Sequence, residues 1–327
     1  MSERSDGGDE GDDESDLLYH VDGELVPADE ATVSVRDRGF MYGDAAFETL
    51  RAYGGDVFRW GAHADRLRET CDVLSLDHGV AADDLKARVD ETLRANELED
   101  AYVRLSVTRG VQPGKLTPEE AVDPTVVVVA TPLPRGGRGS DPVWDGPASL
   151  QTVKTRRVPD RSIPARAKTH NYLNGILARL ELRVTDVAGQ SPAGRRGSLG
   201  DADEAVMLDS DGHLAEGATS NLFFVRDDAL CTPSLDGPVL PGVTRAEVVD
   251  VAAAEEIPVR EGSFTPDDLR DASEAFVTNT TWEIRPVESV DGIDVGGGPV
   301  TTLLSTVFDA RVEREHYAEG GSEPNGR

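Results

Sequence analysis

Lysine is rare in this sequence, and one of its lysines lies in a segment of polar residues. The 327 residues contain 33 lysines and arginines, of which only Lys86, Lys115, Lys154 and Lys168 are lysines. Arginine stays protonated in proteins, whereas a desolvated lysine can lose its proton and attack a carbonyl carbon. Lys168 is therefore a candidate for a catalytic lysine that forms a Schiff base. A surface lysine without a special role is the alternative.

Two later segments combine a glycine with polar side chains. Glu216 is followed by Gly217 and then by Ser220-Asn221, and glycine permits a bound group to approach the backbone closely. Leu240-Pro-Gly-Val243-Thr244 precedes a predicted helix, whose first amides and the Thr244 hydroxyl can bind an anion. The alternatives are an exposed Glu-Gly turn and an ordinary helix start with a capping threonine.

An arginine early in the chain offers a further contact for an anion. Arg59, in Phe58-Arg59-Trp60, has the forked donors that match a phosphate group. The alternative is a solvated arginine before a helix. His63 and Arg66 follow in that predicted helix, and we interpret them as side chains that brace the local structure.

The elements that must position these residues are predicted from periodicity and turn signals. Strands are predicted at 18–27, with an Asp22-Gly23 turn, and at 47–59, around Gly54-Gly55. Helical periodicity predicts helices at 62–76, 82–96, 171–184, 244–256 and 301–317. Further strands are predicted at 101–108, 125–130, 150–156, 204–208, 222–225 and 275–278.

These elements predict an α+β fold of two domains. A small N-terminal domain at 17–134 follows an acidic disordered tail at 1–16, and a Pro/Gly-rich linker covers 135–147. A larger β-rich domain at 148–314 contains a polar surface loop at 189–201 and is followed by a C-terminal tail at 315–327.

The composition argues against several classes of function. The net charge of −29 and the pI near 4.5 make nucleic acid and anionic lipid unlikely partners, because both are negatively charged. Cys71 and Cys231 are the only cysteines, and no cluster has metal-ligand spacing, so we predict no metal site. Without a membrane-length apolar run or a signal peptide, we expect a cytoplasmic protein. The acidic, arginine-rich composition is typical of a salt-loving cytoplasm.

In five ordered segments between residues 19 and 290, the chain resembles the class IV, or fold-type IV, pyridoxal-phosphate enzymes. That family includes branched-chain aminotransferases, D-amino-acid aminotransferases and 4-amino-4-deoxychorismate lyases. The segments are 58–67, Lys168-Thr-His-Asn171-Tyr172, 214–224, 240–245 and 277–287. The resemblance implies pyridoxal 5'-phosphate as the cofactor, a homodimer, and a fold-type IV architecture with a small N-terminal α/β domain and a larger C-terminal β-rich domain.

The resemblance also implies roles for individual residues. Lys168 forms the Schiff base with the cofactor and then transfers the substrate proton. Glu216 lies beside the pyridine nitrogen, where a carboxylate stabilises the protonated ring. The remaining cofactor contacts are a tyrosine near the ring oxygen, a leucine that packs against the ring, and groups that hold the phosphate: Tyr172, Leu240, Arg59, Val243, Thr244 and Thr280.

Three reactions compete within the family. The Lys168-x-x-Asn171 spacing and Phe47-Glu-Thr49 resemble 4-amino-4-deoxychorismate lyases, so we predict release of 4-aminobenzoate and pyruvate. Branched-chain transamination with 2-oxoglutarate is the alternative, although those enzymes usually carry one more glycine after the lysine. D-amino-acid transamination is disfavoured, because Gln112 to Leu116 lacks the Arg-x-His carboxylate trap. A cofactor-binding protein without activity is a fourth hypothesis, against which the complete motif set argues.

The expected substrate contacts follow from the same comparison of motifs. Arg104 and Arg109 are candidates for binding a carboxylate, and an arginine at the core edge is the alternative for either. The candidates for the rest of the substrate pocket are Tyr42, Phe47, Thr49 and Thr281.

Overall fold

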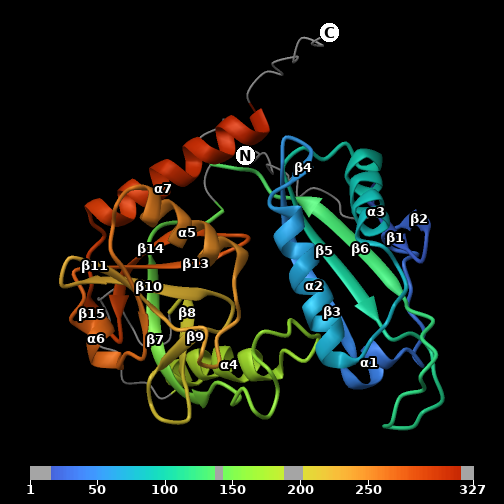
Figure 1. Ribbon diagram of the computed structural model, residues 1–327, viewed down its shortest axis with the longest axis horizontal. Helices are drawn as coiled ribbons and strands as arrows, with labels where there is room; N and C mark the ends of the chain where they lie inside the picture. Colours follow the sequence, from blue (N-terminus) through green and yellow to red (C-terminus); the bar gives the residue numbers. More distant parts are fainter. Residues whose placement is uncertain (1–15, 137–142, 188–201, 318–327) are drawn as a thin grey trace, which may run out of the picture.

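The computed structural model describes residues 16–136, 143–187 and 202–317. These residues form two β-sheets, one from each half of the chain, and each sheet packs with helices of its own half (Figure 1). The predicted two-domain α+β fold, with a larger β-rich second part, is confirmed. The domain boundaries themselves stay predictions.

The first sheet has six strands in the order β2-β1-β6-β5-β3-β4, all antiparallel to their neighbours. Its strands are β1 (Leu18–Val21), β2 (Glu24–Pro27), β3 (Ala45–Tyr53), β4 (Asp56–Val57), β5 (Ala101–Thr108) and β6 (Val126–Pro132). Asp22 and Gly23 both have positive φ angles, 49° and 102°, between β1 and β2, as the predicted two-residue hairpin requires.

Helices cover one face of this sheet and leave the other face to the second half of the chain. They are α1 (Arg38–Tyr42), α2 (Trp60–Leu74) and α3 (Ala82–Ala95). Residues from β3, β5 and β6, such as Leu50 and Val103, form one buried cluster with Leu67 of α2 and Val89 of α3. On β3 the side chains alternate between this core and the opposite face.

The second sheet has the order β12-β11-β10-β13-β14-β7-β8-β9, with β15 paired to β14. Its strands are β7 (Ala148–Arg156), β8 (Glu204–Leu208), β9 (Leu214–Gly217), β10 (Asn221–Arg226), β11 (Ala229–Pro233), β12 (Val259–Gly262), β13 (Glu274–Asn279), β14 (Glu283–Val290) and β15 (Ile293–Asp294). The pairs β11–β12, β14–β7 and β7–β8 are parallel.

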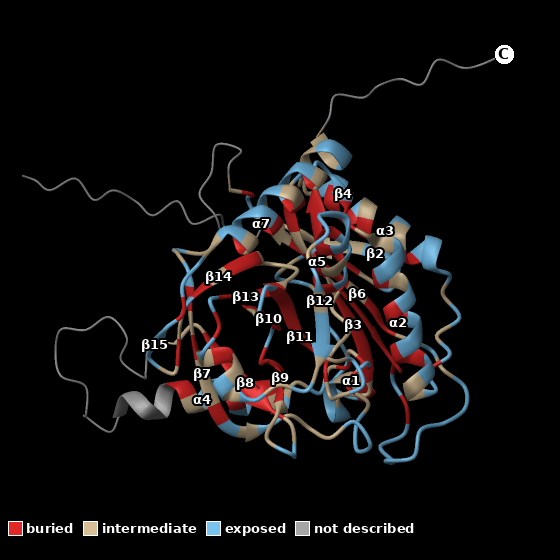
Figure 2. Ribbon diagram, turned by 60° about the vertical axis from the view of Figure 1, so that its left-hand side comes forward, coloured by how far each residue is buried: buried red, intermediate tan, exposed pale blue. Residues whose placement is uncertain are grey.

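Four helices and a terminal turn accompany this sheet in the described part of the chain. They are α4 (Leu173–Val187), α5 (Val243–Ala254), α6 (Pro266–Arg270), α7 (Pro299–Val312) and a π-helical turn (Glu313–Tyr317). Phe223 and Phe276 stack with ring centroids 5.0 Å apart and share a cluster with Val248 of α5 and Phe308 of α7. Figure 2 shows the burial of these strands beneath helices with exposed outer faces.

The predicted long elements are confirmed, and most short ones were missed. All five predicted helices occur, with ends within three residues of those predicted when the π-helical turn is counted with α7. The strands β9, β11, β12, β14 and β15 and the helices α1 and α6 were not predicted, because most are too short to show a period of their own. Residues 1–15 of the tail predicted at 1–16, the loop at 189–201 and part of the linker lie outside the described residues. Residues 315–317, predicted as the start of a tail, belong instead to the helical turn that ends at Tyr317.

Two arginines join the halves of the chain. Arg51 of β3 donates to the carbonyls of Leu133 and Pro134, after β6, and to the carbonyl of Thr281, after β13. Arg135 forms ion pairs of 2.7 Å with Asp309 of α7 and Glu313.

No helix among the described residues is long and apolar enough to cross a membrane.

A buried ion-pair cluster anchors the turn before β3, and we predict a large stability loss when it is broken. Asp44 accepts from Arg38 at 2.7 Å and from Arg109 at 2.8 Å, and both arginine side chains are only 4% exposed. Asp44→Ala leaves two buried guanidinium groups without their carboxylate, so we expect the free energy of unfolding to fall by about 3–5 kcal/mol. Denaturant titration measures this change.

The control is Asp72→Ala, because Asp72 pairs with Arg68 at 3.6 Å on the exposed side of α2. An exposed pair of this kind contributes about 1 kcal/mol or less. Equal losses for the two variants would contradict the importance assigned to Asp44.

Candidate active site

Lys168 lies at the junction of the two sheets, in the segment between β7 and α4. Its carbonyl accepts from the Phe47 amide at 3.0 Å, and its own amide donates to Thr70 Oγ1 at 2.9 Å. The next residue, Thr169, forms a bridge with Ala46 of β3. The lysine backbone is therefore held by the first half of the chain, while the elements on either side of it belong to the second half.

The Lys168 amine is half-buried beside two aromatic rings. Its Nζ lies 3.0 Å from Tyr172 Oη and 4.5 Å from the centroid of the Phe47 ring. The Tyr172 hydroxyl fixes the direction of the amine, and Tyr172 and Phe47 meet edge to face with centroids 5.3 Å apart. This arrangement presents one amine to a confined space.

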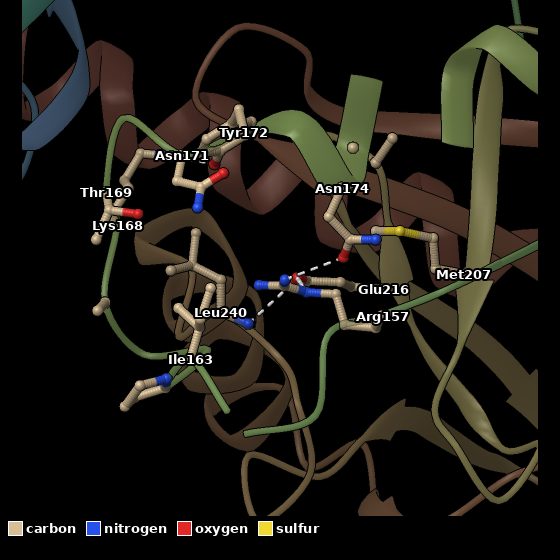
Figure 3. Close-up of a pocket in the computed structure, with 14 residues that line it drawn as sticks. Arg157, Ile163, Lys168, Thr169, Asn171, Tyr172, Asn174, Met207, Glu216 and Leu240 are labelled. Carbon is tan, nitrogen blue, oxygen red and sulfur yellow. Dashed lines mark hydrogen bonds and ion pairs between the residues drawn. The ribbon is translucent and has the colours of Figure 1, made fainter. Parts of the chain in front are cut away.

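Glu216 faces the same space from near the end of β9. Its Oε1 accepts from Arg157 Nε at 2.6 Å, and its Oε2 accepts from the Leu240 amide at 2.9 Å. Burial raises the pKa of the Glu216 carboxyl, and Arg157 and the Leu240 amide oppose that rise. Figure 3 shows the segment of Lys168 along one side of the cavity and the Arg157–Glu216 pair on the other.

The space between these residues consists of two adjoining hollows that share part of their lining, and both are open to solvent. Five residues line both hollows: Lys168, Tyr172, Glu216, Ala218 and Leu240. One hollow extends toward Arg157, Asn171, Asn174 and Met207, and the other extends toward the start of α5 and the end of β13.

The second hollow has the donors of an anion site. Gly242, Val243 and Thr244 line it at the first turn of α5, whose N-cap residue Gly242 makes no side-chain capping hydrogen bond. The uncapped amides and the helix dipole favour a phosphate there. Thr278 also lines this hollow, and its buried hydroxyl oxygen has no hydrogen-bond partner among the described residues.

Glycine is required where the backbone closes in around this hollow. A Cβ atom on Gly242 would lie 2.0 Å from Asn221 Oδ1, and a Cβ atom on Gly217 would lie 2.3 Å from Ser220 Oγ. Asn221 in turn donates to the Leu240 carbonyl at 3.0 Å. The donor set and the close packing both fit a phosphorylated ring compound.

The structure places Arg66, and not Arg59, at this hollow. Arg59 is the N-cap of α2, and its guanidinium pairs with Glu247 at 2.5 Å and Glu315 at 2.6 Å, away from the cavity. Arg66, two turns later on α2, lines the cavity. The prediction that Arg59 reaches a phosphate is corrected: its N-terminal position on the helix directs it to α5 and the terminal turn.

The predicted substrate residues separate into two groups. Arg104 Cζ lies 3.8 Å from the centroid of the Phe47 ring, and Thr49 and Thr281 lie close by, since the Thr49 carbonyl accepts from Thr280 Oγ1 at 3.1 Å. Arg109 is instead a structural residue, because it is 3% exposed and pairs with Asp44.

Tyr42 also lies away from the cavity walls. It is on α1, is 39% exposed, and packs its ring against the Arg38 guanidinium at 4.9 Å. None of the predicted substrate residues is among those that line the two described hollows. Phe47 and Arg104 lie beside the Lys168 amine, whereas Tyr42 contacts Arg38 and Arg109 contacts Asp44.

The sequence that forms this site matches a known family. The family model "Amino-transferase class IV" matches residues 45–290. The chain belongs to the class IV aminotransferases. The match includes every residue that lines the cavity. As a member of this family, the protein is a pyridoxal-phosphate-dependent enzyme.

The similar proteins include aminotransferases named for branched-chain substrates. A Methanocaldococcus jannaschii protein named "Putative branched-chain-amino-acid aminotransferase" is 38% identical over 89% of this chain and 95% of its own length. The structure of a Thermoproteus uzoniensis branched-chain aminotransferase with norvaline has a TM-score of 0.80 at 30% identity, covering 92% of this chain and 96% of that one. A T.th. branched-chain aminotransferase, with pyridoxamine 5'-phosphate, has a TM-score of 0.79 at 31% identity, covering 90% and 94%.

Two further class IV relatives bear on the competing reactions. A Listeria innocua D-alanine aminotransferase is 30% identical over 90% of this chain and 96% of its own length. A Legionella pneumophila structure titled "Putative 4-amino-4-deoxychorismate lyase" has a TM-score of 0.73 at 23% identity, covering 86% and 95%. At that identity, the likeness to the lyase shows the fold alone.

Two arginines are among the residues of the site that the sequence did not predict for it. Arg157 was overlooked in an arginine-rich strand end, and Arg66 was interpreted as a local brace. The signal for Arg66 was available in its spacing: His63 and Arg66 are three residues apart on one helix and therefore face the same side. The signal for Arg157 was not, because its partner Glu216 is 59 residues away.

A histidine beside the site makes the stability of the fold depend on pH. His170 packs edge to face on Phe47, and burial, assisted by the charge of Arg104, lowers the pKa of His170 to about 4. The unfolded chain binds a proton near pH 6.5 that the folded protein binds only near pH 4. Neutral His170 therefore does not reduce the free energy of unfolding above pH 6.5. As the pH falls from 6.5 to 4, proton binding to the unfolded chain lowers the free energy of unfolding by about 1.4 kcal/mol per pH unit.

We therefore predict that the free energy of unfolding of His170→Gln falls less steeply between pH 6.5 and 4 than that of the wild type. The difference in slope should correspond to about one fewer proton bound on unfolding. Unfolding midpoints measured across that window test this prediction. His213→Gln is the control, because His213 is 40% exposed at the turn before β9. An unchanged slope for His170→Gln would show that His170 does not titrate as described.

Proposed function

We propose that this enzyme transfers the amino group of branched-chain amino acids to 2-oxoglutarate. The cavity in which the Lys168 amine faces the Arg157–Glu216 pair, next to an uncapped helix start, carries the pyridoxal-phosphate chemistry of the proposal. The likeness to branched-chain aminotransferases over about nine-tenths of the chain supports the choice of substrate. This replaces the lyase as the preferred reaction.

The residues present fit the cofactor. Its phosphate would be held by Arg66, by the Val243 and Thr244 amides, and by the Thr244 hydroxyl. Thr280 lines the same hollow, but its hydroxyl donates to the Thr49 carbonyl and would have to turn to reach the phosphate. Leu240 and Tyr172 would contact the ring, and Glu216 would meet the pyridine nitrogen. When bound, the cofactor supplies a carbonyl for Schiff-base formation and a ring that withdraws electrons from the substrate.

The chain's own contribution to the chemistry is a proton relay and a fixed charge. Lys168 Nζ, which lies 3.0 Å from the Tyr172 hydroxyl, would accept the proton of the substrate α-carbon and give it up again later in the reaction. Arg157 pairs with the Glu216 carboxylate and favours its ionised form. An ionised carboxylate would stabilise a protonated pyridine nitrogen.

The face of β3 and β5 near Lys168 would bind the substrate. Phe47 offers an apolar surface beside the amine, and Arg104, against the same ring, offers a positive charge for a carboxylate. Thr49 and Thr281 would complete this wall. The Phe47 ring suits the aliphatic side chain of a branched-chain amino acid. The Arg104 cation beside it suits the second carboxylate of 2-oxoglutarate.

The lyase reaction is the second candidate, since the Lys168-x-x-Asn171 spacing and Phe47-Glu-Thr49 favour it. The same Lys168 proton transfer would serve release of pyruvate and 4-aminobenzoate. The walls of the cavity, and not its catalytic centre, separate the two reactions, so turnover must decide between them.

We predict that the enzyme forms glutamate from 2-oxoglutarate with leucine, isoleucine or valine as the donor. Parallel assays with aminodeoxychorismate and with D-alanine should give no 4-aminobenzoate and no pyruvate above background. Because the chain carries a charge of −29, all arms are run at the same high salt concentration. Product from aminodeoxychorismate alone would establish the lyase, and activity in no arm would refute both reactions.

Lys168→Ala should remove the visible absorbance band that borohydride abolishes in the wild-type enzyme, and should lower kcat by at least about 10²-fold. The matched control is Lys154→Ala, because Lys154 is an exposed residue of β7. A band that persists in Lys168→Ala and disappears in Lys154→Ala would transfer the catalytic role to Lys154.

We also propose that the enzyme is a homodimer. Helix α4 exposes an apolar stripe of Leu173, Ile176, Leu177 and Leu180, each 44–58% exposed, and α1 exposes Phe40, which is 74% exposed. Both helices lie along the lower edge of the molecule in Figures 1 and 2. Apolar surface of this kind is typical of a permanent interface.

Light scattering should give twice the 35.0 kDa mass of the chain. Ile176→Glu should shift the protein toward the monomer, because it places a charge in the apolar stripe. Leu303→Glu, at an isolated exposed position of α7 that is 40% exposed, should leave the mass unchanged. A monomeric wild-type protein would refute the dimer.

A further inference from the structure

We propose that Glu48 and His63 are positioning residues that aim the Arg66 guanidinium at the cofactor phosphate. This inference rests on the proposed function, because it concerns the phosphate of the bound cofactor. It assigns a task to two buried polar groups that the proton relay and the Glu216 charge do not use.

The contact between Glu48 and Arg66 is a fork of two hydrogen bonds. Arg66 Nε donates to Glu48 Oε1 at 2.9 Å, and Arg66 Nη2 donates to Glu48 Oε2 at 2.5 Å. His63 Nδ1 lies 2.8 Å from the same Oε2. Two parallel bonds fix the plane of a guanidinium as well as its position, and the histidine fixes the carboxylate.

A third bond ties Arg66 to the phosphate side of the site. Arg66 Nη1 donates at 2.9 Å to the carbonyl of Pro241, which directly precedes the N-cap Gly242 of α5. Arg66 belongs to α2 and α5 to the other half of the chain, so this bond aligns the two sides of the anion site. A guanidinium has five N–H donors, and these three bonds leave two for an anion in the cavity that Arg66 lines.

Burial makes this arrangement rigid and explains its composition. Glu48 is 1% exposed, His63 2% and Arg66 7%. Glu48 points from β3 into the core of the first sheet, between Ala46 and Leu50, where a carboxylate is costly unless it is paired. Although burial opposes ionisation, Arg66 and hydrogen bonds from Arg66 and His63 lower the pKa of Glu48 to about 2, so the fork is present at neutral pH.

The proposal predicts an effect opposite in sign to that of simple charge. Glu48 lies behind the Arg66 guanidinium, and its negative charge repels the cofactor phosphate. If charge alone mattered, removing the charge of Glu48 should therefore tighten cofactor binding. If Glu48 instead holds Arg66 in place, Glu48→Gln loses one bond of the fork and frees the guanidinium. Binding of the phosphorylated cofactor should then weaken.

The experiment is a titration of the apoenzyme with pyridoxal phosphate and, separately, with pyridoxal, which lacks the phosphate. For Glu48→Gln we expect the Kd for pyridoxal phosphate to rise at least about tenfold and the Kd for pyridoxal to change less than about threefold. In an Arg66→Met background, Glu48→Gln should cause no further weakening, since the residues act as a unit. The unfolding midpoint of each apoenzyme is measured alongside.

Two further variants keep the test decisive if Glu48→Gln folds poorly. His63→Leu should weaken pyridoxal phosphate binding selectively, and His63→Asn, which keeps a donor toward Glu48, should restore it. Asp44→Asn is the matched control, because it alters another buried carboxylate with two arginine partners, away from the cavity. It should lower the unfolding midpoint without changing either Kd.

Several outcomes would overturn the inference. One is tighter or unchanged binding of pyridoxal phosphate by Glu48→Gln. Another is an equal loss of affinity for pyridoxal and for pyridoxal phosphate. A third is that Glu48→Gln weakens pyridoxal phosphate binding as much in the Arg66→Met background as in the wild type. Failure of the proposed function has a different signature, because it appears as absent turnover of leucine, isoleucine and valine while the wild-type apoenzyme still binds pyridoxal phosphate.

Discussion

A short backbone pairing between residues 45–47 and 168–170 is the interaction on which the site depends. The Phe47 amide donates to the Lys168 carbonyl, the His170 amide donates to the Ala45 carbonyl, and Ala46 and Thr169 form a bridge. This pairing joins the first sheet to the segment between β7 and α4. It sets the lysine amine above Phe47 and opens a cavity between the halves of the chain.

Buried carboxylates held by arginines stand on both sides of that cavity. Glu216 is held by Arg157 on the side of the second sheet, and Glu48 is held by Arg66 on the side of the first. Each pair places a carboxyl group where burial opposes its charge, and in each the arginine hydrogen bonds act against that effect. The pairs differ in which member reaches the cavity: Glu216 presents the carboxylate, whereas on the other side Arg66 presents the guanidinium.

The division of labour in the site explains why its reaction is harder to infer than its cofactor. In the proposed function, Lys168, Glu216 and the start of α5 would serve steps that are common to transamination and to the lyase reaction. Selectivity would come from the proposed substrate side, formed by β3, β5 and the turn after β13, where Phe47, Arg104 and Thr281 lie. The short spacing after Lys168 first favoured the lyase, but spacing along the chain does not describe the shape of this side.

The sequence by itself determined the long elements, the family and the residues with local signatures. Lys168, the Glu216–Gly217 step and the glycine before α5 were found because each lies in a contiguous motif with a chemical reason. Only the tertiary structure decided which arginine reaches the anion hollow, that Arg109 is structural, and that Arg157 supports Glu216. The physical reason is that an arginine side chain is long and can pair in several directions, so its role depends on the carboxylates that folding brings near it. Arg59 meets Glu247 and Glu315, and Arg66 meets Glu48, and those partners are between 18 and 256 residues away.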